Sequence, residues 1–234
     1  DNASSAAKYP PPRVRATVFP NSPEAAAAIE AAIRMAAGKP TGPLTKTDLM
    51  KVTKLSIKEK QITDLIPFSL LTSLNYLSLY YNEITDLTPI AKLTELETLG
   101  LNGNKITNLE VLTELKNLKL IILSRNQIID LKPLEELTQL NYLAIHHNQI
   151  TDLTPLTGLT ALETLGLYNN RITDLTPLAE LKNLDELLLN NNQISNLSPL
   201  KGLTKLELLN LRDNPKLTGA QIAELQKALP KCRI

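Results

Sequence analysis

Tryptophan is absent from this chain of 234 residues, and only 3% of the residues are aromatic. Aromatic side chains normally supply much of the buried volume in a core of this size, so we expect leucine to fill the interior instead. Cysteine is nearly absent as well: Cys232 stands alone, which excludes an intramolecular disulfide. The fold must therefore be stabilised by aliphatic packing rather than by cross-links.

The chain also lacks an excess of charge of either sign, because its formal net charge is only +1 at pH 7. Binding to nucleic acid or to an acidic membrane surface normally requires a strong basic patch. No stretch approaches the ~18 consecutive apolar residues expected of a membrane span. We therefore expect neither a nucleic-acid partner nor membrane insertion.

Asparagine recurs at a strict interval of 22 residues along most of the chain. A leading apolar residue keeps the same interval, and each unit reads roughly L-x-x-L-x-L-x-x-N-x-I-T-D-L-x-P-L-x-x-L-x-x without insertions. Seven complete units occupy residues 52–205, and a divergent eighth begins at Leu206. This self-similarity indicates a repeat array whose neighbouring units stack, because one unit cannot bury its own apolar face. The repeated asparagines are Asn82, Asn104, Asn126, Asn148, Asn170, Asn192 and Asn214.

The local pattern of one unit predicts its shape. In Leu77-Ser78-Leu79 the apolar residues alternate, which predicts a short strand with its leucines inward. Asn82 follows where the chain leaves the strand, and its amide can satisfy backbone groups that the turn leaves unpaired. Asp86 is predicted to be the N-cap of a short 3₁₀ turn on the opposite side. The predicted fold class is an α/β solenoid: a right-handed leucine-rich repeat horseshoe with a parallel concave β-sheet, 3₁₀ turns on the convex side and helical caps at both ends.

Both ends of the array carry helix signals. At the front, Ser22 is a predicted N-cap and Pro23 the first position of a helix that runs to Ala37 and stops at Gly38, and a second short helix is predicted over about 46–51. At the back, an apolar stripe predicts a helix over 220–229. The chain is thus divided into a flexible leader (1–20), an N-terminal helical cap (21–51), the repeat array (52–211) and a C-terminal cap helix (212–234).

The chain resembles the internalin family of bacterial surface proteins over about residues 18–211. The resemblance rests on Val18-Phe19-Pro20 before the helical cap and on the N-x-I-T-D-L-x-P-L repeat. It implies a secreted or surface-exposed horseshoe that grips a protein with its concave side. A start at Asp1 rather than methionine favours an extracellular or cell-surface protein whose signal peptide has been removed. Residues 214–217 lead straight into the terminal helix, so we expect no immunoglobulin-like module after the array.

The residues that flank the strand leucines, and the two that precede each asparagine, should point outward on the concave side. These four positions, repeated along the array, form four columns that contain five of the six tyrosines and both histidines. The outer units carry charge and the middle ones carry the tyrosines, which is the composition of a protein-binding patch. The second column is mostly small, so we expect a floor that a partner can approach closely. The predicted contact residues are Tyr76, Tyr80, Tyr81, Leu120, Ile122, Arg125, Tyr142, His146, His147, Tyr168 and Leu188.

The adjacent His146 and His147 invite a metal or catalytic interpretation. Neither has a second set of ligands at metal-like spacing, and no cysteine or carboxylate cluster lies in the same columns of adjacent units. We interpret both as contact residues, whose binding would depend on pH if the imidazoles become charged near pH 6.5. Cys232 has no histidine near it in the sequence and is predicted to pack under the terminal cap. We expect no catalytic residue, no bound metal and no cofactor.

These patterns together favour a non-catalytic scaffold that binds a protein partner through its concave face. Two alternatives use the same architecture. One is an intracellular regulatory subunit that docks on an enzyme, and the other is a cell-surface structural component that assembles with its own copies into a homo-oligomer. The pattern does not favour an enzyme.

Overall fold

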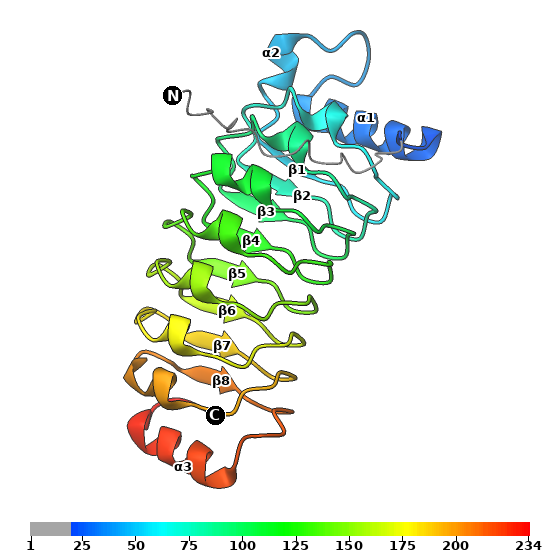
Figure 1. The fold of residues 1–234 in the computed structure, drawn as a ribbon. Coiled ribbons are helices and arrows are strands. Elements are labelled where there is room, and N and C mark those ends of the chain that lie inside the picture. The colour runs from blue at the N-terminus through cyan, green and yellow to red at the C-terminus, as the bar shows by residue number, and fades with distance from the viewer. Residues whose placement is uncertain (1–19) are drawn as a thin grey trace, which may run out of the picture.

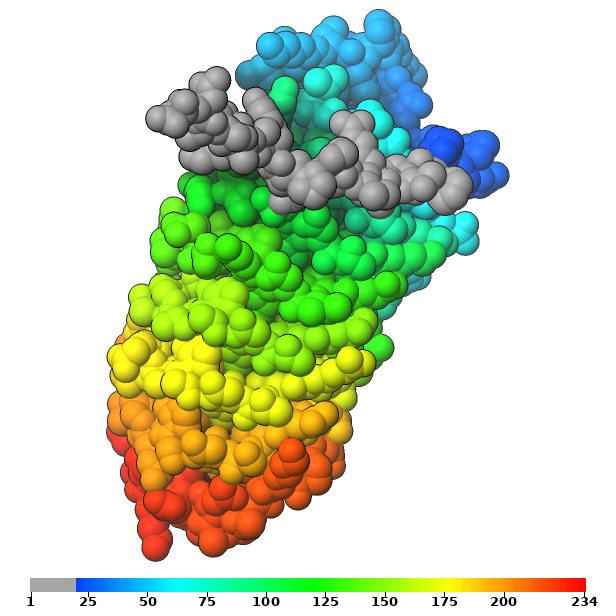
Figure 2. Space-filling view, in the orientation of Figure 1, coloured from blue at the N-terminus to red at the C-terminus, as the bar shows by residue number. Residues whose placement is uncertain are grey.

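The computed structural model describes residues 20–234 as one curved stack of repeats (Figure 1). Residues 1–19, which hold nearly all of the predicted leader together with Val18 and Phe19, lie outside the described residues. Helices α1 (Pro23–Ala37) and α2 (Lys46–Leu49) lie at one end of the stack, and α3 (Gly219–Ala228) closes the other. Where the view in Figure 2 leaves them uncovered, the units follow one another without a break in the surface.

Eight short parallel strands form a single sheet whose order follows the chain from β1 to β8. Each strand residue pairs with the residue 22 positions along, so that Leu55 lies beside Leu77 and Leu77 beside Leu99. The period of the sequence is therefore confirmed as the register of the sheet, and equivalent residues of successive units form straight columns. The strands are β1 (Lys54–Ser56), β2 (Tyr76–Ser78), β3 (Thr98–Gly100), β4 (Leu120–Ile122), β5 (Tyr142–Ala144), β6 (Thr164–Gly166), β7 (Glu186–Leu188) and β8 (Leu208–Asn210).

Leucine fills the interior, as predicted. The middle residue of every strand is buried, and both Leu77 and Leu79 are 0% exposed. Within residues 20–234, Phe68 is the single aromatic side chain of the buried core. Complete burial of a leucine contributes roughly 1.5–3 kcal/mol, so this continuous aliphatic column is the main source of stability.

Short 3₁₀ turns lie on the side opposite the sheet, and the predicted role of Asp86 is wrong in detail. The turn Thr88–Ile90 has Leu87 at its N-cap position, without a side-chain cap. Asp86 precedes that position, and its Oδ1 accepts a 2.8 Å hydrogen bond from the backbone N–H of Thr88. This is an Asx-turn, in which a carboxylate bonds to the backbone two residues on. The same bond recurs at Asp64, Asn108, Asp130, Asp152, Asp174 and Asn196.

The predicted role of the repeated asparagines is confirmed. Oδ1 of Asn126 accepts a 3.0 Å bond from the N–H of Ile106, which belongs to the preceding unit. Its Nδ2 donates to the carbonyl of Leu101 in that unit and to the carbonyl of Leu123 in its own, both at 3.0 Å. Each of the other six asparagines also accepts from the residue 20 positions back and donates to the residue 25 positions back. A ladder of side-chain amides therefore joins every unit to its neighbour.

Local signals explain the helical ends. The Ser22 side chain accepts from the N–H of Ala25 at the start of α1, and Gly38 ends that helix in the left-handed conformation. Helix α2 begins after Thr45 as predicted but ends at Leu49 rather than near residue 51, because the chain must turn there into the first unit, whose leading residue Val52 is buried. Helix α3 begins one residue earlier than predicted, at Gly219, behind a capping box formed by Thr218 and Gln221.

The last residues of the chain add to the sheet. Arg233 forms an isolated parallel bridge with Leu208, donating its backbone N–H to the Glu207 carbonyl at 2.8 Å and accepting from the N–H of Leu209 at 2.9 Å. This pairing covers the outer edge of β8. Cys232 is buried beside it as a free thiol, as predicted, and burial raises the pKa of that thiol.

Replacing Asn126 with alanine should lower the free energy of unfolding by several kcal/mol. The change leaves buried backbone groups of two units without partners, and each such group costs roughly 1–3 kcal/mol. Urea denaturation followed by circular dichroism measures the effect. Asn117→Ala is the control, because Asn117 is exposed and donates only to the Thr94 carbonyl. Equal losses in the two variants would contradict a special role for the ladder.

Candidate functional site

The four predicted columns run straight across the exposed face of the sheet. The first and third residues of each strand form the first two columns, and the two residues before each repeated asparagine form the third and fourth. We define the central face as the column residues of the five middle units, which contain β2 to β6. They are Tyr76, Ser78, Tyr80, Tyr81, Thr98, Gly100, Asn102, Gly103, Leu120, Ile122, Ser124, Arg125, Tyr142, Ala144, His146, His147, Thr164, Gly166, Tyr168 and Asn169. Of the predicted contact residues, only Leu188 lies outside this face, in β7.

Two tyrosines of the β2 unit lean over the next unit. A Cβ atom added at Gly100 would lie 2.7 Å from Cζ of Tyr80, and one added at Gly103 would lie 2.8 Å from Cε1 of Tyr81. The rings therefore occupy the space that side chains at these positions would need. The expected open floor of small residues is consequently filled at Gly100 by Tyr80, while Gly166 has only ordinary contacts at 3.7–3.8 Å. Because both rings rest on the neighbouring backbone, they are held in place before any partner arrives.

At the other end of the central face, aromatic rings of two units pack together. The rings of His146 and Tyr168 are stacked, with centroids 3.9 Å apart and planes 12° from parallel, and the Tyr168 hydroxyl lies 3.0 Å from Nε2 of His146. His147 meets both rings edge-on at 5.3 and 5.4 Å. Its Nε2 lies 3.0 Å from Nδ2 of Asn169, which can donate to a neutral imidazole.

The expectation that the imidazoles become charged near pH 6.5 is wrong. Burial, together with the nearby His147 and Arg125, lowers the pKa of His146 to about 4. Burial and Arg125 also lower the pKa of His147. Burial raises the pKa of Tyr80 and of Tyr168, so both phenols stay protonated at pH 7. His146, His147, Tyr80 and Tyr168 are therefore neutral at physiological pH.

A row of unpartnered polar atoms, which the sequence analysis missed, crosses the middle of the face. Within residues 20–234, the buried side-chain polar atoms without a hydrogen-bond partner are Asn102 Oδ1, Ser124 Oγ and His146 Nδ1. All three belong to the third column in consecutive units, between Tyr80 and Tyr168. Ser124 is only 1% exposed. Buried polar groups are nearly always paired, so this row marks hydrogen-bonding capacity that the chain itself leaves unused.

The fourth column also has a special backbone, which the sequence analysis missed. Every residue in it has a positive φ, between 53° and 69°, a conformation that favours glycine, asparagine and aspartate. Gly103, Asn169, Asn191 and Asp213 fit this requirement. Tyr81, Arg125 and His147 adopt the same conformation, each at φ 54°. The recurrence of asparagine and glycine at this position is the sequence signal that could have revealed it.

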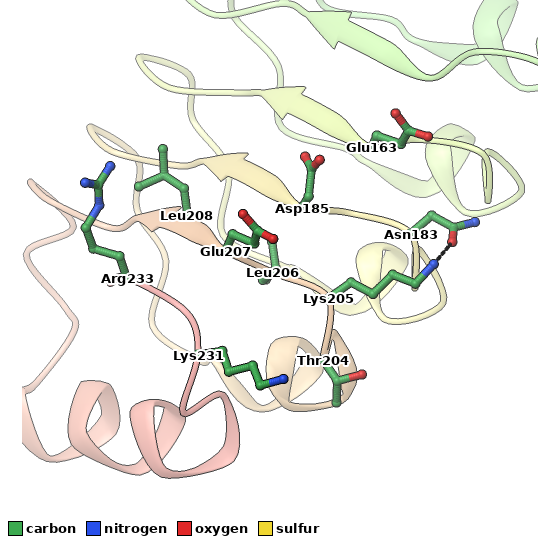
Figure 3. A pocket seen from close by; sticks show the side chains of 10 residues that line it. All are labelled: Glu163, Asn183, Asp185, Thr204, Lys205, Leu206, Glu207, Leu208, Lys231 and Arg233. Atoms are coloured by element: carbon green, nitrogen blue, oxygen red, sulfur yellow. Dashed lines mark hydrogen bonds between the residues drawn. The ribbon is translucent and has the colours of Figure 1, made fainter.

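A separate hollow lies near the C-terminal cap (Figure 3). It has a volume of about 850 Å³ and is lined by carboxylates of three successive units, Glu163, Asp185 and Glu207, and by cations that include Lys231 and Arg233. None of the predicted contact residues lines it. Within the described part of the chain, no group of three or more histidine, cysteine or acidic side chains is arranged to hold a metal ion.

Comparison with known proteins identifies the family of this chain. The family model described as leucine-rich repeats (2 copies) matches residues 72–114, 116–158, 138–180 and 182–227, which is more than half of the chain. The chain belongs to the leucine-rich repeat family. No curated protein gives a significant match. In the portion from residue 20 onward, no helix of this leucine-rich repeat protein is long and apolar enough to cross a membrane.

Two solved structures show which proteins this leucine-rich repeat protein is similar to. An internalin C2 from Listeria monocytogenes is 36% identical with a TM-score of 0.67, and the match covers 83% of this chain and 94% of that one. A leucine-rich repeat protein from Leptospira interrogans is 27% identical with a TM-score of 0.62, and the match covers 80% of this chain and 62% of that one. The predicted resemblance to internalins is thereby confirmed.

Gly100→Ala should lower the free energy of unfolding by about 1–3 kcal/mol and displace the Tyr80 ring, because the added methyl group overlaps that ring. Urea denaturation and the NMR shifts of the Tyr80 ring protons report the two effects. Gly166→Ala is the matched control in the same column, where the new methyl group meets only ordinary contacts. An unmoved Tyr80 ring in Gly100→Ala would contradict the described packing.

Lowering the pH from 7 to 5 should lower the melting temperature. In this range the unfolded chain protonates its imidazoles at an ordinary pKa, whereas folded His146 binds a proton only near pH 4. Proton binding therefore favours the unfolded state. The free energy of unfolding decreases as the pH falls below about 6.5. His146→Gln should flatten the decline in thermal melts between pH 7 and 5. An unchanged slope in this variant would mean that the pKa of His146 is not depressed.

Proposed function

We propose that this protein is a non-catalytic scaffold, secreted or exposed at the cell surface, which binds a partner protein through its central face. The observation that carries the proposal is the set of tyrosine and histidine rings fixed across adjacent units. Tyr80 and Tyr81 rest on glycines of the next unit, and Tyr168 stacks on His146. Aromatic residues with few rotatable bonds supply large contact areas at a small entropic cost.

The distribution of polar groups supports the same proposal. Charged residues occupy the column positions of the outer units, including Lys54, Lys58, Glu186 and Arg212, while the central face is almost uncharged. A protein interface typically combines an aromatic centre with a polar rim. Leu120 and Ile122 are half-buried in β4 and supply apolar area between the two aromatic groups. Leu188 lies towards the rim.

The family comparison agrees with this reading. Leucine-rich repeat arrays stack their units into an extended curved surface of the kind used for binding. The similarity to an internalin favours a secreted or surface location. A signal peptide upstream of the present sequence in the full gene would support export, whereas a methionine start directly before Asp1 would favour an intracellular docking subunit.

The triple variant Tyr80→Ala, Tyr142→Ala and Tyr168→Ala should lose most of its binding to partner protein. Immobilised wild-type and variant proteins are compared by quantitative mass spectrometry of what they retain from surface and secreted fractions of the source cells. A matched control replaces Lys92, Glu114 and Glu136 with alanine; these exposed residues form a column beside the 3₁₀ turns. Partners retained equally by both variants would refute binding through the central face.

A folding control separates loss of binding from loss of structure. Leu79→Ala should cost roughly 2–5 kcal/mol of stability by opening a core cavity, since Leu79 is 0% exposed. The tyrosine variant should lose less, because its rings are only partly buried. Size-exclusion chromatography over a concentration series tests the alternative that the partner is another copy of this chain.

A further inference from the structure

Arg125 is the one formally charged side chain of the central face. The histidines of that face are neutral at pH 7 because their pKa values are lowered, and every other residue of the face is uncharged. The column positions with carboxylates lie outside it, at Glu59, Glu186 and Asp213. A single positive charge therefore stands in the middle of a neutral aromatic surface.

Within residues 20–234, the Arg125 guanidinium has neither an ion pair nor a hydrogen bond. Arg125 is exposed. Its positive charge lowers the pKa values of His146 and His147 and opposes the rise in the pKa of Tyr168. Because no carboxylate among residues 20–234 forms an ion pair with this guanidinium, its donors are available to a partner there.

The backbone gives an independent reason to assign a role to this side chain. Arg125 lies at φ 54°, where its unit could have used asparagine or glycine, as the units of Asn169 and Gly103 do. A long side chain in the left-handed region costs folding free energy. Such strain typically persists where the residue serves a function other than stability.

We propose that Arg125 anchors a carboxylate of the partner protein, namely an aspartate or glutamate side chain flanked by apolar residues. The inference rests on the proposed binding function of the central face. The planar guanidinium can donate two parallel N–H hydrogen bonds, one to each oxygen of a carboxylate. Around it, Leu120 and Ile122 of β4 are half-buried and offer apolar contacts.

A protein carboxylate fits this surface better than the phosphates of nucleic acid or of a lipid surface. Phosphate-rich partners are held by clusters of arginine and lysine, whereas this face has a single cation. The whole chain has a net charge of only +1. Charge complementarity therefore calls for one acidic group in an otherwise apolar segment.

The test uses a display library of random 16-residue peptides, selected on the immobilised chain. Peptides that bind should share one aspartate or glutamate at a fixed distance from apolar or aromatic residues. For a synthetic copy of such a peptide, fluorescence polarisation should show that Arg125→Gln weakens binding about tenfold or more, as does the amide analogue of the peptide's acid. Applying both changes together should weaken binding no further than either alone, and Arg125→Lys should restore part of the affinity.

Thermal denaturation provides a second test of the proposal. Arg125→Asn should raise the melting temperature by about 1–4 °C, because asparagine fits the left-handed backbone better. Asn191→Arg, at φ 56° in the same column, is the matched control and should lower it. A melting temperature for Arg125→Asn at or below that of wild type would show that arginine serves the fold, and would overturn the proposal.

The outcomes also separate this inference from the function on which it rests. Peptides that lose binding with Tyr80→Ala but bind Arg125→Gln as well as wild type would overturn the carboxylate anchor and leave the binding face standing. Peptides insensitive to both changes, or a library without any peptide that depends on the face, would overturn the anchor and count against the face itself.

Discussion

Each repeated asparagine bonds to backbone groups of two units at once, and the rest of the structure depends on this connection. Oδ1 of Asn126 holds the N–H of Ile106, while its Nδ2 holds carbonyls of Leu101 and Leu123. Buried backbone groups must be paired, so a unit that slipped relative to its neighbour would break several bonds together. The ladder therefore fixes the register of the sheet, and with it the straight columns on the exposed face.

Because the columns are straight, a side chain chosen in one unit always meets the same positions of the next. Tyr80 can lie across β3 only because Gly100 carries no side chain there, and Tyr168 can stack on His146 only because the two share a column. Tyr80 and Tyr168 are thus positioned by contacts between units. Since they are already restrained, a partner that covers them gives up little side-chain entropy.

The sequence predicted the solenoid, the sheet register, the asparagine ladder and the location of the columns, because a gapless period of 22 residues leaves one way to stack the units. It missed features that depend on the surroundings of individual atoms. To predict the orientation of the Tyr80 ring, one must know where the next unit leaves space for it. To predict the lowered pKa of His146, one must know how deeply it is buried and how near Arg125 lies. The left-handed fourth column was readable in principle from Gly103, Asn169 and Asn191, but the periodicity of apolar residues does not report φ angles. The N-cap position predicted at Asp86 lies one residue later, at Leu87, and the apolar periodicity does not report this difference either.

The strand-like pairing of Arg233 with β8 has a consequence for how such an array changes over evolutionary time. An open sheet edge is a template for unwanted pairing with other chains, and here the last residues of the chain occupy it, while α1 packs at the β1 end. With both ends of the array closed by dedicated segments, adding a unit beyond β1 or β8 would require a new closure. Duplication or deletion of a 22-residue unit in the interior needs none, because every internal junction uses the same bonds. The length of the face, in steps of about 4.8 Å, is therefore a property that the gene can adjust without rebuilding its ends.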